Sequence, residues 1–285
     1  MTVPINEGVL ERKGCPLHYW TAGPEGRPLV VFTHGACVDH HSFDPHIPVI
    51  AQDYRVLSWD VRGHGRSQPM GDRFNVPLAV DDLLALLDRI GYQKAVHVGH
   101  SSGTYITQEL VFRYPERVQA LVIADGTCIT WKHSRPEMLA LRFATSVMAL
   151  FPFETLKKAS LKNCSLKTDV QDYTYRAFSQ ISKHDFLDIQ RGVYGCLHYE
   201  PGYHISQPLL LTHGDDDYLG DIKKIAPLWA RREPNCQYVA IPNARHFAIL
   251  DNPDFFNRLL LEFLSKWVSP GSDDAKSSYQ TLVSC

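Results

Sequence analysis

The sequence predicts an α/β fold in which a mostly parallel, doubly wound sheet carries a helical cap insertion. Short segments rich in Val, Leu and Ile alternate with amphipathic helical patterns, which is typical of parallel strands covered by helices on both faces. Between residues 128 and 206 the alternation stops and only helical patterns remain. With 285 residues, the chain is long enough to bury one large core and to carry an inserted subdomain as well.

Each element is predicted from a local pattern. The segment 76–91 repeats leucine and isoleucine at helical spacing and ends at Gly91, a residue type that favours helix termination. Another helix is expected over 220–232, although Pro227 lies inside it. Further helices are expected over 103–114 and 253–267, and buried strands over 28–34, 55–60, 94–100, 118–125, 208–214 and 236–242.

The domain boundaries are set by where these patterns change. Residues 1–127 and 207–268 are expected to form the core, and residues 128–206 a helical cap. Residues 269–285 are polar enough to predict a disordered tail. The cap segment holds 10 Lys and Arg against 7 Asp and Glu, so its net charge is +3 although the whole chain has −2. The rest of the chain therefore carries about −5.

The composition excludes several classes of protein. A net charge of −2 gives no electrostatic basis for binding nucleic acid. No apolar run reaches the roughly 18 residues of a membrane span, and the first residues lack the basic and then apolar pattern of a signal peptide. The seven cysteines are scattered without a C-x-x-C pair, which favours reduced thiols. A cytoplasmic protein is expected, and its oligomeric state is left open.

The stretch "VGHSSG" at 98–103 indicates a nucleophile at a tight corner between a strand and a helix. Gly99 and Gly103 stand two residues before and two after Ser101, where small side chains keep neighbouring segments from colliding. Framing Ser102 instead would put a histidine and a threonine at those positions. We therefore take Ser101 as the candidate nucleophile. A phosphate-binding or simply tight turn is the alternative, because G-x-S-x-G alone is a weak signal.

A serine nucleophile needs an imidazole base and a carboxylate that orients it. His246 lies in the loop after the last predicted strand, just before the terminal helix. The acidic run 215–217 directly follows the preceding strand, at the carboxyl edge where ligands gather in open α/β sheets. Asp125, at the end of its own strand, is a rival for the acid. The order along the chain is Ser, then Asp, then His.

Five blocks in order resemble the α/β-hydrolase family, and the resemblance extends over about residues 8–267. The family resemblance implies Ser101 as nucleophile, His246 as general base and Asp217 as acid, because members usually place the acid three residues after the glycine that corresponds to Gly214. Asp215 and Asp216 remain competitors for the acid. The five blocks are 30–67, 98–103, the helix and strand that end at 122–125, 209–220 and 243–264.

The resemblance also implies an oxyanion hole made of two backbone N–H groups. One belongs to Ser102, the residue after the nucleophile, and the other to Ala36, in the loop after the strand 28–34. Cys37, beside this loop, is expected to be an ordinary buried thiol.

Other polar residues that could look catalytic are interpreted as structural. The block at 59–67, "WDVRGHGRS", is a structural turn in the family, which places Asp60, Arg62 and His64 outside the site. Four nearby histidines have irregular spacing and no accompanying cysteine or carboxylate set, so they predict a pocket mouth and no metal centre. They are His34, His40, His41 and His46.

The predicted function is that of a serine hydrolase that cleaves carboxylic esters of small to medium, largely apolar substrates through an acyl-enzyme, without cofactor or metal. The block 40–67 particularly resembles enol-lactone hydrolases and small carboxylesterases. An enol-lactone or carbon–carbon bond (diketone) hydrolase is one alternative, and a catalytically weak, receptor-like ligand-binding member is another. Epoxide hydrolases and haloalkane dehalogenases use an aspartate at the corner, where this chain has Ser101. A peptidase is ranked low.

Overall fold

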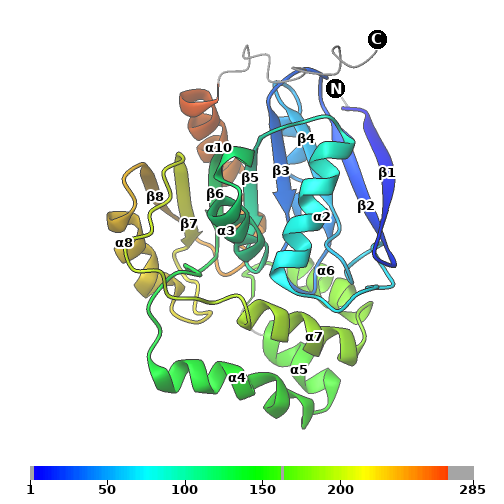
Figure 1. Ribbon diagram of the computed structural model, residues 1–285, viewed down its shortest axis with the longest axis vertical. Helices are drawn as coiled ribbons and strands as arrows, with labels where there is room; N and C mark the ends of the chain where they lie inside the picture. The colour runs from blue at the N-terminus through cyan, green and yellow to red at the C-terminus, as the bar shows by residue number, and fades with distance from the viewer. Residues whose placement is uncertain (1–2, 162–163, 269–285) are drawn as a thin grey trace, which may run out of the picture.

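The computed structural model describes residues 3–161 and 164–268, so the predicted tail at 269–285 lies outside the described residues. One sheet runs in the order β1-β2-β4-β3-β5-β6-β7-β8 (Figure 1). All pairs from β4 to β8 are parallel, which confirms the mostly parallel α/β sheet. The strands are β1 (Ile5–Arg12), β2 (Cys15–Ala22), β3 (Leu29–Thr33), β4 (Arg55–Trp59), β5 (Ala95–His100), β6 (Val118–Ala124), β7 (Leu209–Gly214) and β8 (Cys236–Ile241).

The sequence patterns missed the first two strands. β1 and β2 form an antiparallel hairpin at the edge of the sheet, and β1 is mostly exposed, so it lacks the apolar run that marks a buried strand. The turn between them uses Lys13 and Gly14, both in the left-handed region with φ of 49° and 75°. Two positive φ values suit a tight hairpin turn, so this "KG" pair was the available signal.

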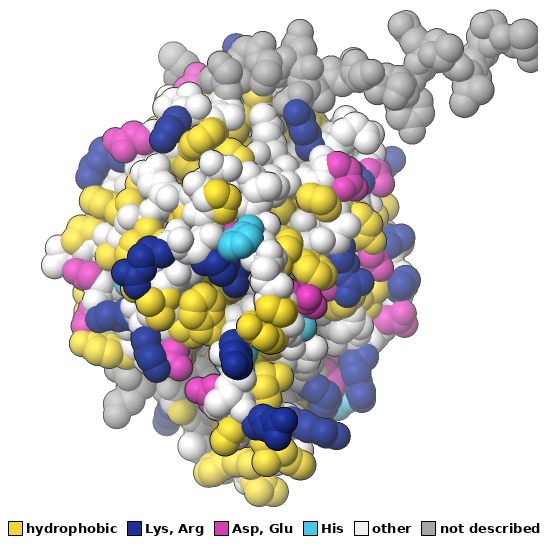
Figure 2. Space-filling view, turned by 60° about the vertical axis from the view of Figure 1, so that its left-hand side comes forward, with side chains coloured by type: hydrophobic (Ala, Val, Ile, Leu, Met, Phe, Trp, Pro, Cys, Tyr) yellow, Lys and Arg dark blue, Asp and Glu magenta, His cyan; other side chains and the backbone are white. Residues whose placement is uncertain are grey.

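Four helices occur among the described residues between β6 and β7, and they lie together below the sheet in Figure 1. No strand occurs among the described residues of 128–206, in agreement with the helical pattern. That these four helices form a separate cap domain stays a prediction. Hydrophobic side chains gather at the lower end of the molecule, at the level of these helices (Figure 2). The four are α4 (Arg135–Ala149), α5 (Phe153–Leu161), α6 (Thr168–Ser179) and α7 (Lys183–Tyr194).

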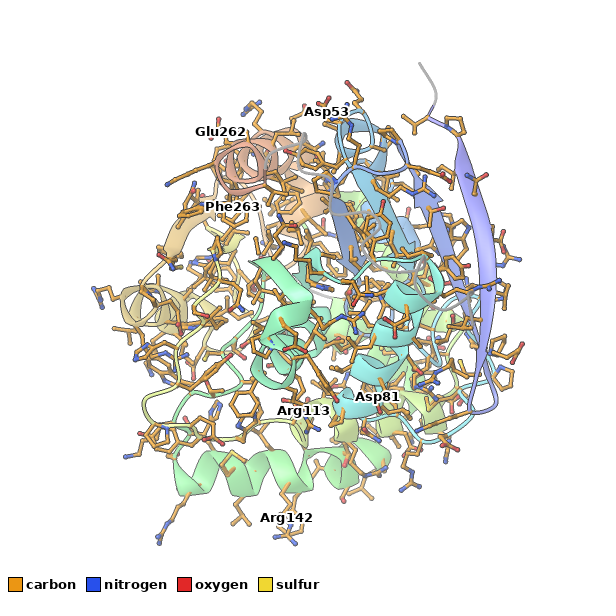
Figure 3. The ribbon with its side chains drawn as sticks, turned by 45° about the horizontal axis from the view of Figure 1, so that its top comes forward. Asp53, Asp81, Arg113, Arg142, Glu262 and Phe263 are labelled. Atoms are coloured by element: carbon orange, nitrogen blue, oxygen red, sulfur yellow. The ribbon has the colours of Figure 1, made fainter. Side chains whose placement is uncertain are left out.

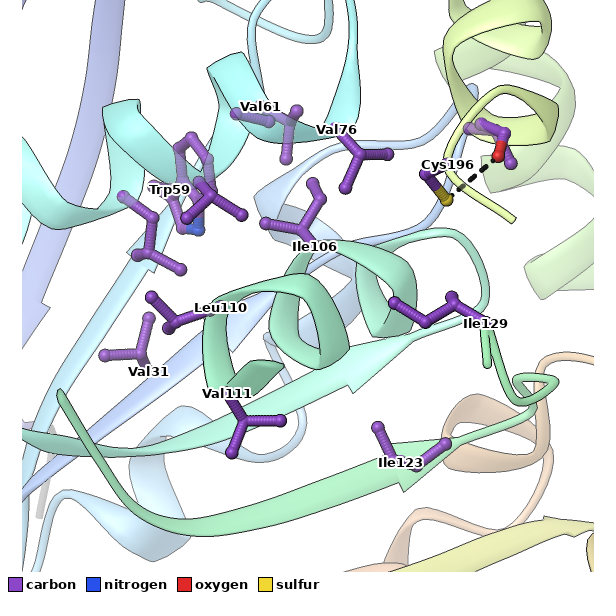
Figure 4. Packing of buried hydrophobic residues seen from close by; sticks show 14 of the residues in the cluster. Val31, Trp59, Val61, Val76, Ile106, Leu110, Val111, Ile123, Ile129 and Cys196 are labelled. Carbon is purple, nitrogen blue, oxygen red and sulfur yellow. Dashed lines mark hydrogen bonds between the residues drawn. The ribbon is translucent and has the colours of Figure 1, made fainter. Parts of the chain in front are cut away.

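The sheet is buried on both faces by two separate hydrophobic layers. Because side chains alternate along a strand, Val31 of β3 joins one layer while Val30 joins the other. The first layer contains α2 and α3, and Figure 4 shows Leu110 of α3 packed beside Val31. The second contains α10, whose Phe263 is buried. These helices are α2 (Val76–Arg89), α3 (Gly103–Arg113) and α10 (Pro253–Trp267), with α1 (Ile47–Ile50), α8 (Ile222–Arg232) and α9 (Ala248–Asp251) completing the set beside the sheet.

Within the described part of the chain, no helix combines the length and the apolar character that crossing a bilayer requires.

Several histidines lie in the core with neutral rings. His34 donates from Nδ1 to the Gly35 carbonyl (2.7 Å) and accepts at Nε2 from the Val61 N–H (2.9 Å), a pattern that only a neutral ring can make. Burial lowers the pKa of His34 and of His100 to about 3. It also lowers the pKa of His46 and of His97 to about 4. A protonated ring would lose its hydration at these sites.

We expect this group of histidines to make the protein sensitive to acid. In the unfolded chain these histidines become protonated near pH 6.5, whereas in the folded protein they stay neutral until about pH 4. The free energy of unfolding therefore falls as the pH drops through this window. Each histidine contributes up to about 1.4 kcal/mol per pH unit. Urea unfolding at a series of pH values should show this slope, and His97→Leu should reduce it by about one proton. A slope that His97→Leu leaves unchanged would contradict this account.

Candidate active site

The corner between β5 and α3 holds Ser101 in a strained conformation. Its φ is +51°, in the left-handed region that a residue with a β-carbon occupies at a cost of about 1–3 kcal/mol. The neighbouring glycines are required by close backbone contacts. A β-carbon on Gly103 would lie 2.2 Å from the Thr33 carbonyl oxygen, and one on Gly99 would lie 2.8 Å from Thr104 Cα. This geometry agrees with the glycine frame that placed the corner at Ser101.

Three side chains from distant parts of the sequence meet at the carboxyl edge of the sheet. The Ser101 hydroxyl lies 2.8 Å from Nε2 of His246, and Nδ1 of His246 lies 3.1 Å from Oδ2 of Asp217. Asp217 is buried, and its other oxygen accepts from the Leu219 N–H (2.8 Å), so the carboxylate is held in place. The structure therefore brings together the three residues that the sequence analysis selected.

The two neighbouring aspartates shape the loop that carries His246. Asp215 accepts a hydrogen bond from the Ala244 N–H (3.2 Å), and Asp216 forms an ion pair with Arg245 (3.2 Å). Both contacts fall one or two residues before His246. These carboxylates thus connect the loop after β7 to the loop after β8, while the third aspartate of the run faces the imidazole.

Asp125, the rival acid, occupies a different place in the site. It is fully buried, and burial followed by the nearby charge of Asp217 raises its pKa well above the usual range. Its Oδ1 accepts from the Gly214 N–H (2.9 Å) and its Oδ2 from the Ala248 N–H (3.2 Å). Gly214 begins the loop of Asp217, and Ala248 lies two residues after His246. Asp125 therefore connects the loops of Asp217 and His246 to β6.

His100, directly before the nucleophile, was not selected from the sequence. Its Nε2–H donates to the backbone carbonyl of His246 (2.9 Å), which fixes the main chain of the candidate base. Burial holds the pKa of His100 at about 3, so the ring stays neutral beside His246. Its position could have indicated this role, because His100 is the last residue of β5 and directly precedes the nucleophile candidate.

The loop after β3 passes directly against the corner. A β-carbon on Gly35 would lie 2.9 Å from Cβ of Ser101, so only glycine allows this approach. Ala36 follows in this loop, and Ser102 is the N-cap residue of α3. The backbone amide of Ser102 therefore lies at a helix N-terminus, where the helix dipole favours negative charge. Burial raises the pKa of the Cys37 thiol, which agrees with an ordinary buried cysteine.

Two loops of the site are attached to the helical insertion. The Tyr173 hydroxyl of α6 donates to Oδ1 of Asp39 (2.8 Å), just beyond the Ala36 loop. Asp251 accepts from the Leu166 N–H (3.1 Å) and from the Arg245 N–H (2.8 Å), so it links the insertion to the loop of His246. Sequence reasoning had no signal for these contacts, which join residues far apart in the chain.

The block at 59–67 is structural, as the sequence analysis expected. Arg62 and Asp82 are both fully buried and form a two-pronged ion pair, with Nε–Oδ2 at 2.6 Å and Nη2–Oδ1 at 2.8 Å. Asp60 accepts from the N–H groups of His40 (2.8 Å) and Arg66 (2.7 Å). These contacts hold the loop after β4 and leave none of the three residues against the Ser101 hydroxyl.

Removing one partner of the buried pair is expected to destabilise the fold. Arg62→Met removes both hydrogen bonds from the guanidinium to the buried Asp82 carboxylate and leaves only Arg12, at 3.6 Å, beside it, which costs about 3 kcal/mol of unfolding free energy. Urea denaturation measures the change. Arg89→Met, at an exposed position of α2, is the matched control and should change stability by less than about 0.5 kcal/mol. Equal changes in unfolding free energy for the two substitutions would show that the buried Arg62–Asp82 pair does not stabilise the fold.

The four clustered histidines have separate partners. His34 bonds within the loop of Gly35, as described above, and His46 lies 2.7 Å from Oδ1 of Asn257. His40 contacts Asp60 and stacks on Trp20, and His41 contacts Asp44. Across residues 3–161 and 164–268, no group of three or more His, Cys, Asp or Glu side chains is arranged to hold a metal ion.

A cavity of about 650 Å³ lies apart from this site. It is formed between the start of α2, the second half of α3 and the end of α7, and its lining includes Phe74, Glu109, Phe112 and His198. None of Ser101, Asp217 or His246 lines it.

Known proteins are similar to this chain in sequence and in fold. A family model described as the alpha/beta hydrolase fold matches residues 28–145. Human epoxide hydrolase 4 is 25% identical, over 90% of this chain and 78% of that protein. The bifunctional esterase/perhydrolase of Acinetobacter calcoaceticus is 26% identical, over 90% of this chain and 98% of that protein.

Solved structures resemble the fold over nearly its whole length. A thermophilic esterase from Thermogutta terrifontis superposes with a TM-score of 0.80 at 19% identity, covering 92% of this chain and 98% of the esterase chain. The family match, the relatives and the sheet order agree with one another. The chain has the α/β-hydrolase fold, and the family match and the relatives support its place among the hydrolases of that superfamily.

Proposed function

We propose that the protein is a serine hydrolase of carboxylic esters that works through an acyl-enzyme. The observation that carries this proposal is the continuous hydrogen-bonded series Ser101–His246–Asp217, with the serine raised on a strained corner. A hydroxyl is a weak nucleophile until a neutral imidazole removes its proton, and the series supplies that imidazole at 2.8 Å. The small-molecule substrate is an ester or lactone.

The first half of the reaction forms the acyl-enzyme. His246 takes the hydroxyl proton at Nε2 while Oγ of Ser101 attacks the substrate carbonyl carbon, and Asp217 stabilises the resulting imidazolium through Nδ1. The negative charge on the carbonyl oxygen is stabilised by the backbone N–H groups of Ala36 and Ser102. His246 then gives its proton to the leaving alcohol as the ester bond breaks.

The second half returns the free enzyme. Water gives a proton to Nε2 of His246 and its oxygen attacks the acyl carbon on Ser101. The same two backbone N–H groups stabilise the negative charge of this second tetrahedral intermediate. When it collapses, the carboxylic acid leaves and His246 returns the proton to the serine oxygen.

The corner residue favours ester hydrolysis over epoxide opening. Epoxide hydrolases of the family use an aspartate at the corner, and here that position is Ser101. The buried carboxylate nearby, Asp125, accepts two backbone N–H bonds that hold it in the scaffold. A hydroxyl nucleophile with an imidazole base suits acyl transfer to water.

Substrate size is expected to be limited by the helices that cover the carboxyl edge of the sheet. We expect hydrolysis of p-nitrophenyl esters with acyl chains of about two to eight carbons, and little action on emulsified long-chain triglyceride, because an enclosed pocket of ordinary volume holds a drug-sized ligand. A chain-length series run beside a panel of lactones measures this. Preference for triglyceride would contradict the enclosed pocket, and activity confined to lactones would favour the enol-lactone alternative.

A further inference from the structure

Helix α4 carries an apolar face that is open to solvent. Thr145 is the one buried residue among the fifteen of this helix. Leu139, Phe143 and Val147 follow one another at a spacing of four, which places them on one side of the helix, and they are 57%, 53% and 52% exposed. Leu150, 83% exposed, and Phe151 extend the face beyond the helix end. We call these five residues the α4 face.

The helix is firmly held by contacts that leave this face free. A capping box of Ser134 and Glu137 begins it. At its other end, Lys183 of α7 donates to the carbonyls of Ala149 (2.7 Å) and Phe151 (2.8 Å). The exposed face is therefore carried by a helix that is held at both ends, at the lower end of the molecule in Figure 1.

Positive charge surrounds the α4 face. Residues 131–161 contain five Lys and Arg against two Asp and Glu, a net charge of +3 in a chain of −2. Both acids are engaged, Glu137 in the capping box and Glu154 with Lys157. Arg142 points away from the body of the protein (Figure 3), and Lys and Arg side chains lie close above the hydrophobic lower end in Figure 2. The other exposed cations are Lys132, Arg135 and Lys158.

We propose that the α4 face docks on the surface of an anionic lipid bilayer. A helix with large apolar side chains on one side and Lys or Arg beside them lies in the plane of the interface, with the apolar side buried among the acyl chains and the cations at the headgroups. The docking is independent of the reaction proposed for Ser101. It would hold the insertion, which is hydrogen-bonded to two loops of the candidate site, at the surface where apolar esters dissolve.

A second copy of the chain fits this face less well. Two-fold pairing through the α4 face would bring two patches of net charge +3 together, and like charges across an interface oppose association. An anionic surface gives the opposite sign. The convex side of one helix also needs no matching groove in order to enter a fluid bilayer.

Vesicle flotation of the full chain tests the proposal. The probes are vesicles of phosphatidylcholine mixed with phosphatidylglycerol, and vesicles of phosphatidylcholine alone. Phe143→Ser/Leu150→Ser should reduce partitioning to the anionic vesicles at least about tenfold. Ile5→Ser/Val9→Ser, which removes two exposed apolar side chains from β1, is the matched control and should leave partitioning unchanged.

A second pair of variants isolates the charge. Arg135→Gln/Arg142→Gln should reduce partitioning by about thirtyfold at low ionic strength and have a smaller effect at high ionic strength. Arg89→Gln/Arg231→Gln, exposed positions on α2 and α8, should have little effect. Thermal denaturation of each variant verifies the fold without using activity, so this test is separate from that of the esterase proposal.

Three results would overturn the docking. They are no partitioning to anionic vesicles, partitioning that the control pairs reduce as much as the α4 pairs, and self-association of the lipid-free chain that Phe143→Ser/Leu150→Ser abolishes. The last result, read by light scattering after gel filtration, would assign the face to a second copy.

Discussion

Ser101→Ala is expected to lower kcat/KM for an aryl ester by about 10⁴-fold or more, and His246→Ala by a similar factor. The hydroxyl and the imidazole act as one unit, so losing either leaves only the contribution of binding and of the two N–H donors. Ser102→Ala should keep most activity, because the reaction uses the backbone N–H of that residue and not its side chain. Initial rates with p-nitrophenyl butyrate measure all three.

The adjacent serines make Ser102→Ala a matched control for Ser101→Ala. Both remove one hydroxyl from partly exposed positions of the same turn. If Ser102→Ala were inactive and Ser101→Ala active, the corner would be assigned to the wrong serine. Near-normal turnover in Ser101→Ala would remove the acyl-enzyme route altogether.

Asp217→Asn is expected to reduce kcat by about 10⁴-fold while the melting temperature stays close to that of the parent. An amide at this position cannot accept the Nδ1–H of His246 and stabilise its charge in the same way, and it favours the wrong tautomer. The fold should tolerate the change, because the amide oxygen can still accept from the Leu219 N–H and the amide NH2 can donate to the other tautomer of His246. Steady-state kinetics and differential scanning calorimetry measure the two effects.

Asp125→Asn provides the comparison, and the opposite result is expected. It should lower the free energy of unfolding by about 1–3 kcal/mol, since one of the two backbone N–H groups that Asp125 satisfies loses its acceptor. Turnover should fall far less than in Asp217→Asn. Loss of turnover in Asp125→Asn with near-normal activity in Asp217→Asn would transfer the acid to the end of β6.

Local patterns were sufficient for the parts of the fold that are buried on two sides. Residues 94–100 and 118–125 were expected as strands from their apolar runs, and β5 and β6 cover nearly the same residues. β1 was not predicted, because an edge strand faces water and its sequence therefore lacks a run of apolar residues. Helix α8 formed despite Pro227, which shows that burial of its apolar side outweighed the lost hydrogen bond.

The candidate site was accessible to sequence reasoning where spacing determines geometry. The glycines around Ser101 and the position of Asp217 after Gly214 are local relations, and the structure places these residues together with His246. The supporting contacts were not accessible. Asp251 meets Leu166 and Tyr173 meets Asp39 only because the insertion folds back on the core, and such pairings follow from tertiary packing alone.

The most direct test of the account is to trap the covalent intermediate on the protein. A fluorophosphonate reagent, which reacts with activated serines, should add one group per chain, and peptide mass mapping should place it on Ser101. The adduct should be absent from Ser101→Ala and should form far more slowly in His246→Ala, whereas Ser102→Ala should be labelled like the parent. An adduct on Ser102 or on Cys37, or full ester turnover by a protein whose Ser101 stays unlabelled, would contradict the proposed mechanism.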